Sequence, residues 1–290
     1  MSEAVFLDYE RAALDAQYDN RAKVPDFQAH LDLWTDRSSV ARGRYACELG
    51  VAYGLSQDET LDIFHAEGSW PAPVQIFFHG GYWTKLSKNE FSFIANAFVP
   101  RGITTVVVDY ALIPSVDMDE LVRQCRAALV WVWRNISRYG GDPERIQVAG
   151  HSAGGHLAAM LMATNWPAVD AGLPQNPICD AVGISGLYDL EPIRHCFLNQ
   201  TLGLSPDSAV RNSPAALVRA CTSPMLLAVG GDEGAEYLRQ TEALRAAWAE
   251  GLNPPQIQVM EGAHHFSMMS QLEDRDAPLS LAMQARIACA

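Results

Sequence analysis

The chain carries Gly150-His151-Ser152-Ala153-Gly154 directly after the apolar run 146–149 and just before a helical pattern that begins at residue 155. A G-x-S-x-G segment between a strand and a helix forms a sharp turn that lifts the serine hydroxyl above the edge of a sheet. The two glycines leave room for this strained turn. The pattern predicts Ser152 as a nucleophile; the structural alternative is a small-residue turn that only serves tight helix–strand packing.

Outward from this turn, short apolar runs alternate with longer amphipathic patterns from residue 74 onward. Such alternation is typical of a mostly parallel sheet with helices on both faces. The expected strands are 74–78, 104–108, 146–149, 181–184, 225–229 and 257–260, and the expected helices are 117–138, 155–164 and 235–248. With the turn at Ser152, this order predicts an α/β-hydrolase fold.

The pattern before residue 70 is less regular. It contains a polar helical stretch at 10–18 and two segments, near Val51 and Leu61, that could form leading strands. We expect a single domain over 1–290, in which 1–70 supplies the N-terminal segment and leading strands and 71–290 supplies the catalytic core.

A serine hydroxyl is a weak nucleophile until a base takes its proton. In this fold the chain order is serine, acid, histidine. His264 and His265 follow the last expected strand, whereas His195 precedes the strand that carries the acid. The residues by themselves predict that one of this adjacent pair is the base, and they leave open which one.

The acid is expected on the loop after strand 225–229, where Asp232 and Glu233 stand side by side. Its task is to hold the imidazole tautomer and to stabilise the imidazolium that forms. Only one of the two carboxylates can do this, and the other is expected to be a solvated surface charge.

The segment His79-Gly80-Gly81-Tyr82-Trp83 follows strand 74–78, where such enzymes place the loop that stabilises a developing oxyanion. We expect the backbone N–H groups of Gly81 and Tyr82, together with that of Ala153, to be the donors. His79 is expected to be structural. A plain Gly-Gly turn is the alternative for this segment.

Composition excludes several classes of function. A net charge of −13 without a basic cluster argues against nucleic acid as a partner. No apolar run is long enough to cross a bilayer, and residues 1–10 carry acidic residues and no basic region before an apolar stretch, so they do not resemble a secretory signal. We therefore expect a cytoplasmic protein that does not bind membranes. Six scattered cysteines and eight histidines show no metal-ligand spacing, so we expect reduced thiols, no metal and no cofactor.

Several segments together resemble the kynurenine formamidase (arylformamidase) branch of the α/β-hydrolases, close to the hormone-sensitive-lipase-like esterases. They span most of the chain: Tyr18-Asp19-Asn20-Arg21-Ala22 with Pro25, HGGYW at 79–83, GHSAGGHLA at 150–158, SGLYDLEPI at 185–193, and Glu236-Tyr237 with Arg239-Gln240. The resemblance implies hydrolysis of a small aryl formamide or carboxylic ester through an acyl-enzyme, without a cofactor. A general short-chain carboxylesterase and, more remotely, a non-catalytic ligand-binding protein of this fold are the alternatives.

Carried over residue by residue, the resemblance places the nucleophile at Ser152 and the base at His265, because His265 directly precedes Phe266; His264 becomes the alternative. The acid falls three residues before Glu236, on Glu233, although the usual residue type in the family is Asp. The resemblance also implies a substrate pocket lined by Tyr82, Trp83, Leu187, Tyr188 and Phe266. The sequence as a whole also allows a homodimer.

Overall fold

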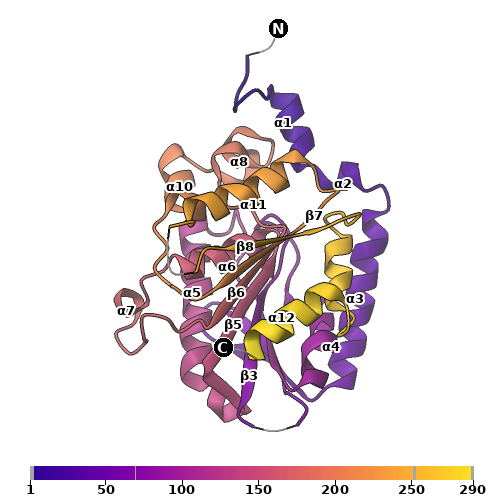
Figure 1. The fold of residues 1–290 in the computed structure, drawn as a ribbon, viewed down its shortest axis with the longest axis vertical. Coiled ribbons are helices and arrows are strands. Elements are labelled where there is room, and N and C mark those ends of the chain that lie inside the picture. Colours follow the sequence, from indigo (N-terminus) through magenta and orange to yellow (C-terminus); the bar gives the residue numbers. More distant parts are fainter. Residues whose placement is uncertain (1–2, 69, 251–252, 289–290) are drawn as a thin grey trace.

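The computed structural model describes residues 3–68, 70–250 and 253–288. Its centre is one eight-stranded sheet in the order β1-β2-β4-β3-β5-β6-β7-β8 (Figure 1). The strands are β1 (Cys47–Ala52), β2 (Thr60–Phe64), β3 (Ala72–Phe78), β4 (Thr104–Val108), β5 (Gly141–His151), β6 (Asp180–Ile184), β7 (Met225–Gly230) and β8 (Gln256–Met260). The β1–β2 and β2–β4 pairs are antiparallel. The five remaining neighbouring pairs, β4–β3, β3–β5, β5–β6, β6–β7 and β7–β8, are parallel.

The central strands are continuous apolar runs because helices cover both of their faces. β4 reads TTVVV, and all five of its residues are buried. Valine and threonine suit this position because branching at Cβ restricts χ1 and packs well on a pleated surface. The predicted mostly parallel α/β architecture is therefore confirmed.

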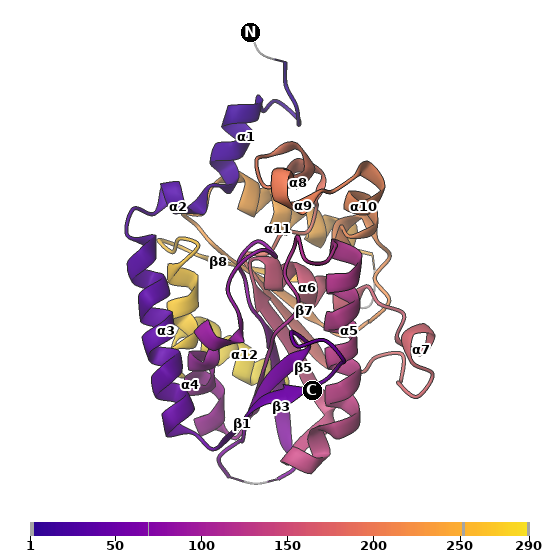
Figure 2. The same ribbon diagram turned by 180° about the vertical axis from the view of Figure 1, so that it is seen from behind.

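Helices lie on both sides of the sheet (Figures 1 and 2). On one side are α5 (Met118–Asn135), α6 (Ala153–Met162) and α11 (Ala235–Ala247). On the other side are α3 (Phe27–Arg44), α4 (Ala95–Phe98) and α12 (Pro278–Ala288). No helix in the described part of the chain is both long and apolar enough to cross a bilayer.

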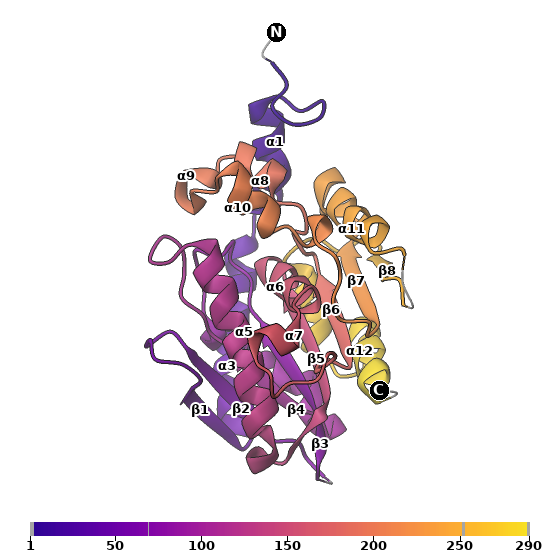
Figure 3. The ribbon, with the colours of Figure 1, turned by 90° about the vertical axis from the view of Figure 1, so that its left-hand side faces the viewer.

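A group of short helices gathers beyond the carboxyl ends of the parallel strands (Figure 3). It comprises α1 (Arg11–Tyr18), α2 (Asn20–Lys23), α8 (Glu191–His195), α9 (Asn199–Leu202) and α10 (Pro206–Arg211). The short helix α7 (Trp166–Val169) lies apart from this group, at the side of the molecule (Figure 1). Parallel α/β sheets bind ligands at the carboxyl ends of their strands. The N-terminal residues thus lie above the same end of the sheet as Ser152.

The expected strands and helices after residue 74 agree with the structure to within a few residues at each end, apart from β5. β5 begins at Gly141 rather than at residue 146, because Gly141 already pairs with Ala72. The main omission is α3. Its sequence is polar, and it buries only Trp34, Ser38 and Ala41, a narrow stripe at helical spacing.

The five cysteines in the described ranges, Cys47, Cys125, Cys179, Cys196 and Cys221, are free thiols. Burial raises the pKa of Cys179 and Cys196 to about 12 and that of Cys221 to about 11. Cys289 lies outside the described residues.

Candidate active site

Ser152 occupies the turn between β5 and α6 with φ 58° and ψ −117°. The positive φ is strained for a residue with a side chain, and strain of this kind persists only where the surroundings hold it. The Ser152 N–H donates to the carbonyl of Ile184 at 2.8 Å. A Cβ at Gly150 would overlap the backbone of Gly154, and one at Gly154 would overlap the carbonyl of Phe78. Glycine at both positions therefore lets the turn close.

The loops after β7 and β8 bring a carboxylate and an imidazole together. The Nδ1 atom of His265 lies 2.7 Å from Oε2 of Glu233. The other Glu233 oxygen accepts from Ser185 Oγ at 2.5 Å and from the N–H of Gly230 at 2.6 Å. Only 1% of Glu233 and 6% of His265 are exposed. Both carboxylate oxygens are thus occupied, and Nε2 is the ring nitrogen left for Ser152.

The two neighbouring alternatives lie elsewhere. Asp232 is exposed, and its N–H donates to the carbonyl of Ala263. His264 is half-buried with its ring edge-on to His30 at 5.1 Å between centroids, and its Nδ1 accepts from the N–H of Ser267. Burial, and then the neighbouring His30, lowers the pKa of His264. The structure brings Glu233 and His265 together and leaves Asp232 and His264 outside this pair.

His151 is a site residue that the sequence did not single out. Its Nε2–H donates to the carbonyl of His265 at 3.0 Å, and the two rings are 4.5 Å apart between centroids. Burial, and then the nearby His265, lowers the pKa of His151 well below its ordinary value. The neutral ring therefore supports the backbone that carries His265. The position of His151 beside Ser152 was the available signal.

The loop after β3 lies against the Ser152 turn. A Cβ at Gly80 would be 3.2 Å from the Ser152 Cβ and 3.0 Å from the His151 carbonyl oxygen, a tight fit that glycine avoids. His79 is fully buried: it stacks on Tyr110 at 4.2 Å between centroids, and its Nδ1 and Nε2 contact the Gly80 carbonyl and Asp109. These contacts place His79 in the support of the loop rather than in the cavity.

Three backbone N–H groups in this region have no backbone acceptor. Within the part of the chain that the structure describes, no backbone carbonyl accepts from Gly81 or Tyr82. Ala153 opens α6, and the first four N–H groups of a helix have no partner inside it. Free N–H groups beside a nucleophilic serine are what an oxyanion hole requires.

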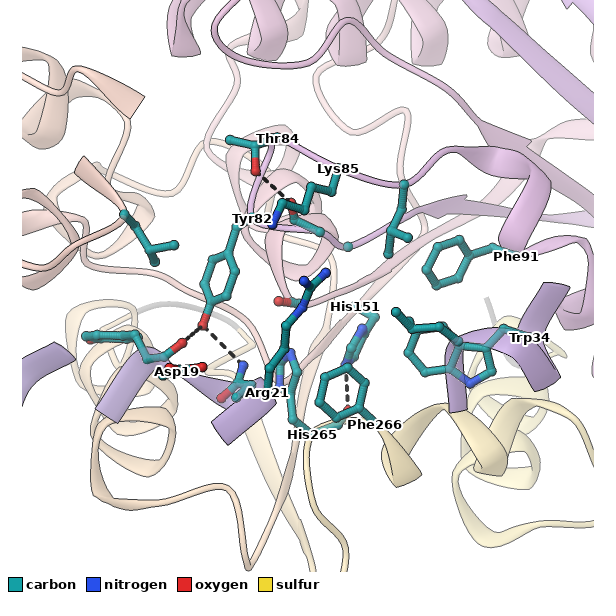
Figure 4. Close-up of a pocket in the computed structure, with 18 of the residues that line it drawn as sticks. Asp19, Arg21, Trp34, Tyr82, Thr84, Lys85, Phe91, His151, His265 and Phe266 are labelled. Carbon is teal, nitrogen blue, oxygen red and sulfur yellow. Dashed lines mark hydrogen bonds between the residues drawn. The ribbon is translucent and has the colours of Figure 1, made fainter. Parts of the chain in front are cut away.

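Ser152 and His265 line one cavity of about 140 Å³ (Figure 4). This volume is close to that of an engineered cavity of about 150 Å³ that binds benzene. Aromatic walls come from Trp34, Phe91 and Phe266; in Figure 4, Trp34 and Phe91 lie to the right of His151 and Phe266 lies below it. Sequence reasoning found Phe266 and Tyr82 but missed the other lining residues, namely Tyr18, Asp19, Asn20, Arg21, Leu31, Trp34, Thr84, Lys85, Leu86, Phe91, Phe197 and Leu198.

Three residues expected in the pocket do not line this cavity. Trp83 is fully buried, and its Nε1–H donates to Nδ1 of His156 at 3.2 Å. The Tyr188 ring lies against Gly183 and Gly186, and Leu187 belongs to the apolar core. Trp83 thus contacts α6 and Tyr188 packs on β6 and the loop after it, and a role of these three side chains in a substrate pocket stays a prediction. The described residues also contain no group of three His, Cys, Asp or Glu side chains that could hold a metal ion.

The fold, with a strained serine at the strand–helix turn and an acid–histidine pair on the later loops, defines an α/β-hydrolase. The BD-FAE family model matches residues 61–247. A kynurenine formamidase from Danio rerio is 35% identical over 256 residues, which cover 86% of this chain and 85% of that protein. Esterase LipC from Mycobacterium tuberculosis is 32% identical over 155 residues, 51% of this chain and 38% of that protein.

A solved structure from Silicibacter sp. TM1040, provisionally assigned as a thioesterase, has a TM-score of 0.83 and 27% identity, and the match covers 93% of this chain and 98% of that one. The chain belongs to the BD-FAE family of α/β-hydrolases and groups there with the kynurenine formamidases. The resemblance seen in the sequence is confirmed.

Proposed function

We propose that the protein is a serine hydrolase of small aryl formamides, with Ser152 as nucleophile, His265 as general base and Glu233 as the acid that orients His265. The observation that carries the proposal is the buried Glu233–His265 contact at 2.7 Å, beside a cavity that His265 and Ser152 both line. Gly81 and Tyr82, two of the expected oxyanion donors, line the same cavity, and Glu233 lies behind His265; this arrangement supports acyl transfer.

In the acylation step, Ser152 Oγ attacks the carbonyl carbon and its proton passes to Nε2 of His265. The imidazolium keeps its Nδ1–H on Glu233, which offsets the new positive charge. The carbonyl oxygen becomes an oxyanion that accepts from the N–H groups of Gly81, Tyr82 and Ala153. The C–N bond then breaks, and His265 returns the proton to the leaving amine.

In the deacylation step, His265 takes a proton from water, and the resulting hydroxide attacks the acyl carbon of the ester formed with Ser152. The second oxyanion uses the same donors. The C–O bond to Ser152 breaks, and the proton returns to Oγ. The products are the free amine and the carboxylic acid, which for a formamide is formic acid.

Two observations support an aryl formamide as the substrate class. Two kynurenine formamidases are 35% and 33% identical to this chain over 86% and 94% of its length. The cavity wall is built from Trp34, Phe91 and Phe266, which suits a flat ring. A general carboxylesterase is the second candidate, because an esterase also matches part of the chain. Both reactions share the mechanism and differ in the leaving group.

Turnover of N-formylkynurenine and of p-nitrophenyl acetate by the purified protein tests the proposal. A formamide is the stricter substrate because its amine must be protonated as it leaves. We expect kcat/KM values for both substrates of at least about 10⁴ M⁻¹s⁻¹, within the ordinary range for enzymes. A value below about 10² for the formamide beside one above 10⁴ for the ester would assign the protein as a carboxylesterase.

Variants in the same assay test the residue roles. We expect Ser152→Ala to abolish turnover and His265→Ala to lower kcat by at least about 10³-fold, because the serine then lacks its base. His264→Ala serves as the matched control, since this ring contacts His30 rather than Glu233, and a loss of less than about 3-fold is expected from its distance to the reaction. Equal losses for the two histidines would contradict the role given to His265.

The single-domain organisation, the cytoplasmic location and the homodimer that the sequence allowed stay predictions. Cell fractionation tests the location, and light scattering on the purified protein gives the oligomeric state.

A further inference from the structure

The segment Tyr18-Asp19-Asn20 was singled out in the sequence, and the mechanism above gives it no task. It joins α1 to α2, and Tyr18 and Asn20 are buried, with 0% and 4% of their surfaces exposed. Their hydrogen-bond partners lie on the loop after β3 and on α11, more than 60 residues away along the chain. We call residues 18–20 the N-terminal arm.

The arm holds the side chain of Tyr82. The Tyr82 hydroxyl lies 2.6 Å from the carbonyl oxygen of Tyr18, 3.1 Å from Nδ2 of Asn20 and 2.8 Å from the hydroxyl of Tyr237. Asn20 Nδ2 also donates to the Tyr237 hydroxyl at 2.7 Å. Figure 4 shows Tyr82 reaching from its loop toward the segment that carries Asp19 and Arg21.

The direction of these hydrogen bonds follows from the groups involved. A carbonyl oxygen only accepts, so the single Tyr82 O–H proton points to Tyr18. The two protons of the Asn20 amide then serve Tyr82 and Tyr237. The Tyr237 proton is left for the Tyr82 oxygen. The arm therefore supplies the acceptor for the Tyr82 proton and one of the two donors to the Tyr82 oxygen.

The backbone of Tyr82 needs such a restraint. Gly81, Tyr82 and Trp83 have φ values of 112°, 50° and 59°. Two consecutive side-chain-bearing residues at positive φ are unfavourable and persist only when the surroundings hold them. The Nε1–H of the Trp83 ring donates to His156 on α6. The Tyr82 hydroxyl is bound by the arm, and the backbone N–H of Tyr82 is one of the oxyanion donors proposed above.

We propose that the N-terminal arm is a positioning element of the oxyanion hole: Asn20 and the Tyr18 carbonyl hold the Tyr82 ring, and the ring fixes the direction of the Tyr82 N–H. This inference rests on the proposed function, because it concerns a donor of that same site. Asn20 and Tyr18 are positioning residues, since they act through Tyr82.

The variants Asn20→Ala, Tyr82→Phe and their double variant test the proposal. Turnover of p-nitrophenyl acetate is measured per active site, with the active sites counted by covalent labelling of Ser152 with a fluorophosphonate. Misdirecting one donor should lower kcat by about 10- to 100-fold, less than complete removal of a donor, while KM changes by less than about 3-fold. Tyr82→Phe removes only one oxygen atom, so it keeps the test open where Asn20→Ala does not fold.

A second readout separates positioning from a general structural role. A trifluoromethyl ketone forms a hemiketal oxyanion on the serine, so its inhibition constant should rise by the same factor as kcat/KM falls. The double variant should lose no more than the more damaging single variant, because both act on one group. Asn135→Ala is the matched control: its amide donates to the Trp131 carbonyl on α5, away from the site, and it should leave all parameters unchanged.

Four results would overturn the proposal. An unchanged kcat per labelled serine would make the arm purely structural, and a change in KM alone would make it a wall for substrate. Losses that multiply in the double variant would show that Asn20 does not act through Tyr82. If the wild-type protein is not labelled by the fluorophosphonate and does not turn over p-nitrophenyl acetate, the proposed function is refuted and this inference with it. If the wild type is labelled and active and the variants have the same kinetic parameters, only the inference is refuted.

Discussion

Glu233 satisfies three donors with two oxygen atoms. Oε2 takes the Nδ1–H of His265, and Oε1 takes Ser185 and the N–H of Gly230. A buried carboxylate that lacks such donors is costly, so these three hydrogen bonds offset the cost of burying Glu233. Asp232, one residue earlier, points into solvent. Of the two adjacent carboxylates in this turn, only that of Glu233 therefore contacts His265.

Exchange of each carboxylate for its amide tests this assignment. Glu233→Gln should lower kcat by about 10³- to 10⁴-fold, because an amide no longer selects the productive histidine tautomer. Asp232→Asn is the matched control, and its kcat should stay within about 2-fold of the wild type, since the side chain is solvated. Steady-state kinetics on an aryl ester measure both, and the reverse ranking would give the role to Asp232.

At the scale of elements, α6 joins the oxyanion loop to the helices above the sheet through His156. Nε2–H of this fully buried ring donates to the carbonyl of Asn212 at 2.7 Å, and Nδ1 accepts from Trp83 Nε1–H at 3.2 Å. Only the neutral Nε2–H tautomer satisfies both partners, because a second ring proton would face the Trp83 donor. Burial accordingly lowers the pKa of His156 to about 4.

This lowered pKa predicts a pH dependence of stability. Between the ordinary histidine pKa of about 6.5 and the folded value of about 4, the unfolded chain binds the extra proton and the folded chain does not. The contribution is therefore complete above pH 6.5 and is lost as the pH falls toward 4. A difference of this size corresponds to about 3 kcal/mol.

Urea unfolding of wild type and His156→Gln across this pH range measures the effect. Glutamine offers one donor and one acceptor but does not titrate, so the wild-type free energy of unfolding should fall about 3 kcal/mol further than that of the variant. Parallel curves for the two proteins would show that His156 titrates normally in the folded state.

At the scale of the whole molecule, the residues before 70 are integral to the sheet and to the site. β2 pairs with β4 along four residues, and β1 extends the edge beyond it. The arm connects to α11 near the other end of the chain, where Tyr18 donates to Glu236 at 2.7 Å. We expect that neither the described residues before 70 nor those after it bury their apolar surfaces alone.

We therefore expect one cooperative unfolding transition. Far-ultraviolet circular dichroism follows the helices and strands, and near-ultraviolet circular dichroism follows the packing of Trp34, Trp83 and Trp166, which lie in different parts of the core. The two urea midpoints should coincide. Separate midpoints would show that the N-terminal segment folds as an independent unit.

The sequence by itself determined the features that depend on neighbouring residues. The Ser152 turn is recognisable from Gly150 and Gly154 alone, because a Cβ at Gly150 would overlap the backbone of Gly154 within the same turn; the requirement for glycine at Gly154 comes in addition from Phe78 on β3. The parallel strands are encoded by short apolar runs, because burial on both faces demands them. The resemblance to a known family then favoured Glu233 and His265 over their neighbours.

The tertiary structure decided the features that depend on distant segments. Asp232 and Glu233 carry the same chemical group, and so do His264 and His265, so the residue types alone do not decide between the members of each pair. The packing of the two loops orients Glu233 and His265 inward. Trp83, Leu187 and Tyr188 were expected in the substrate pocket, yet all three side chains are buried in the apolar core. α3 and the N-terminal arm contribute to the cavity wall together with Phe91 and Phe266. Sequence reasoning missed most of these residues, because contacts between segments far apart in the chain leave no local pattern in the sequence.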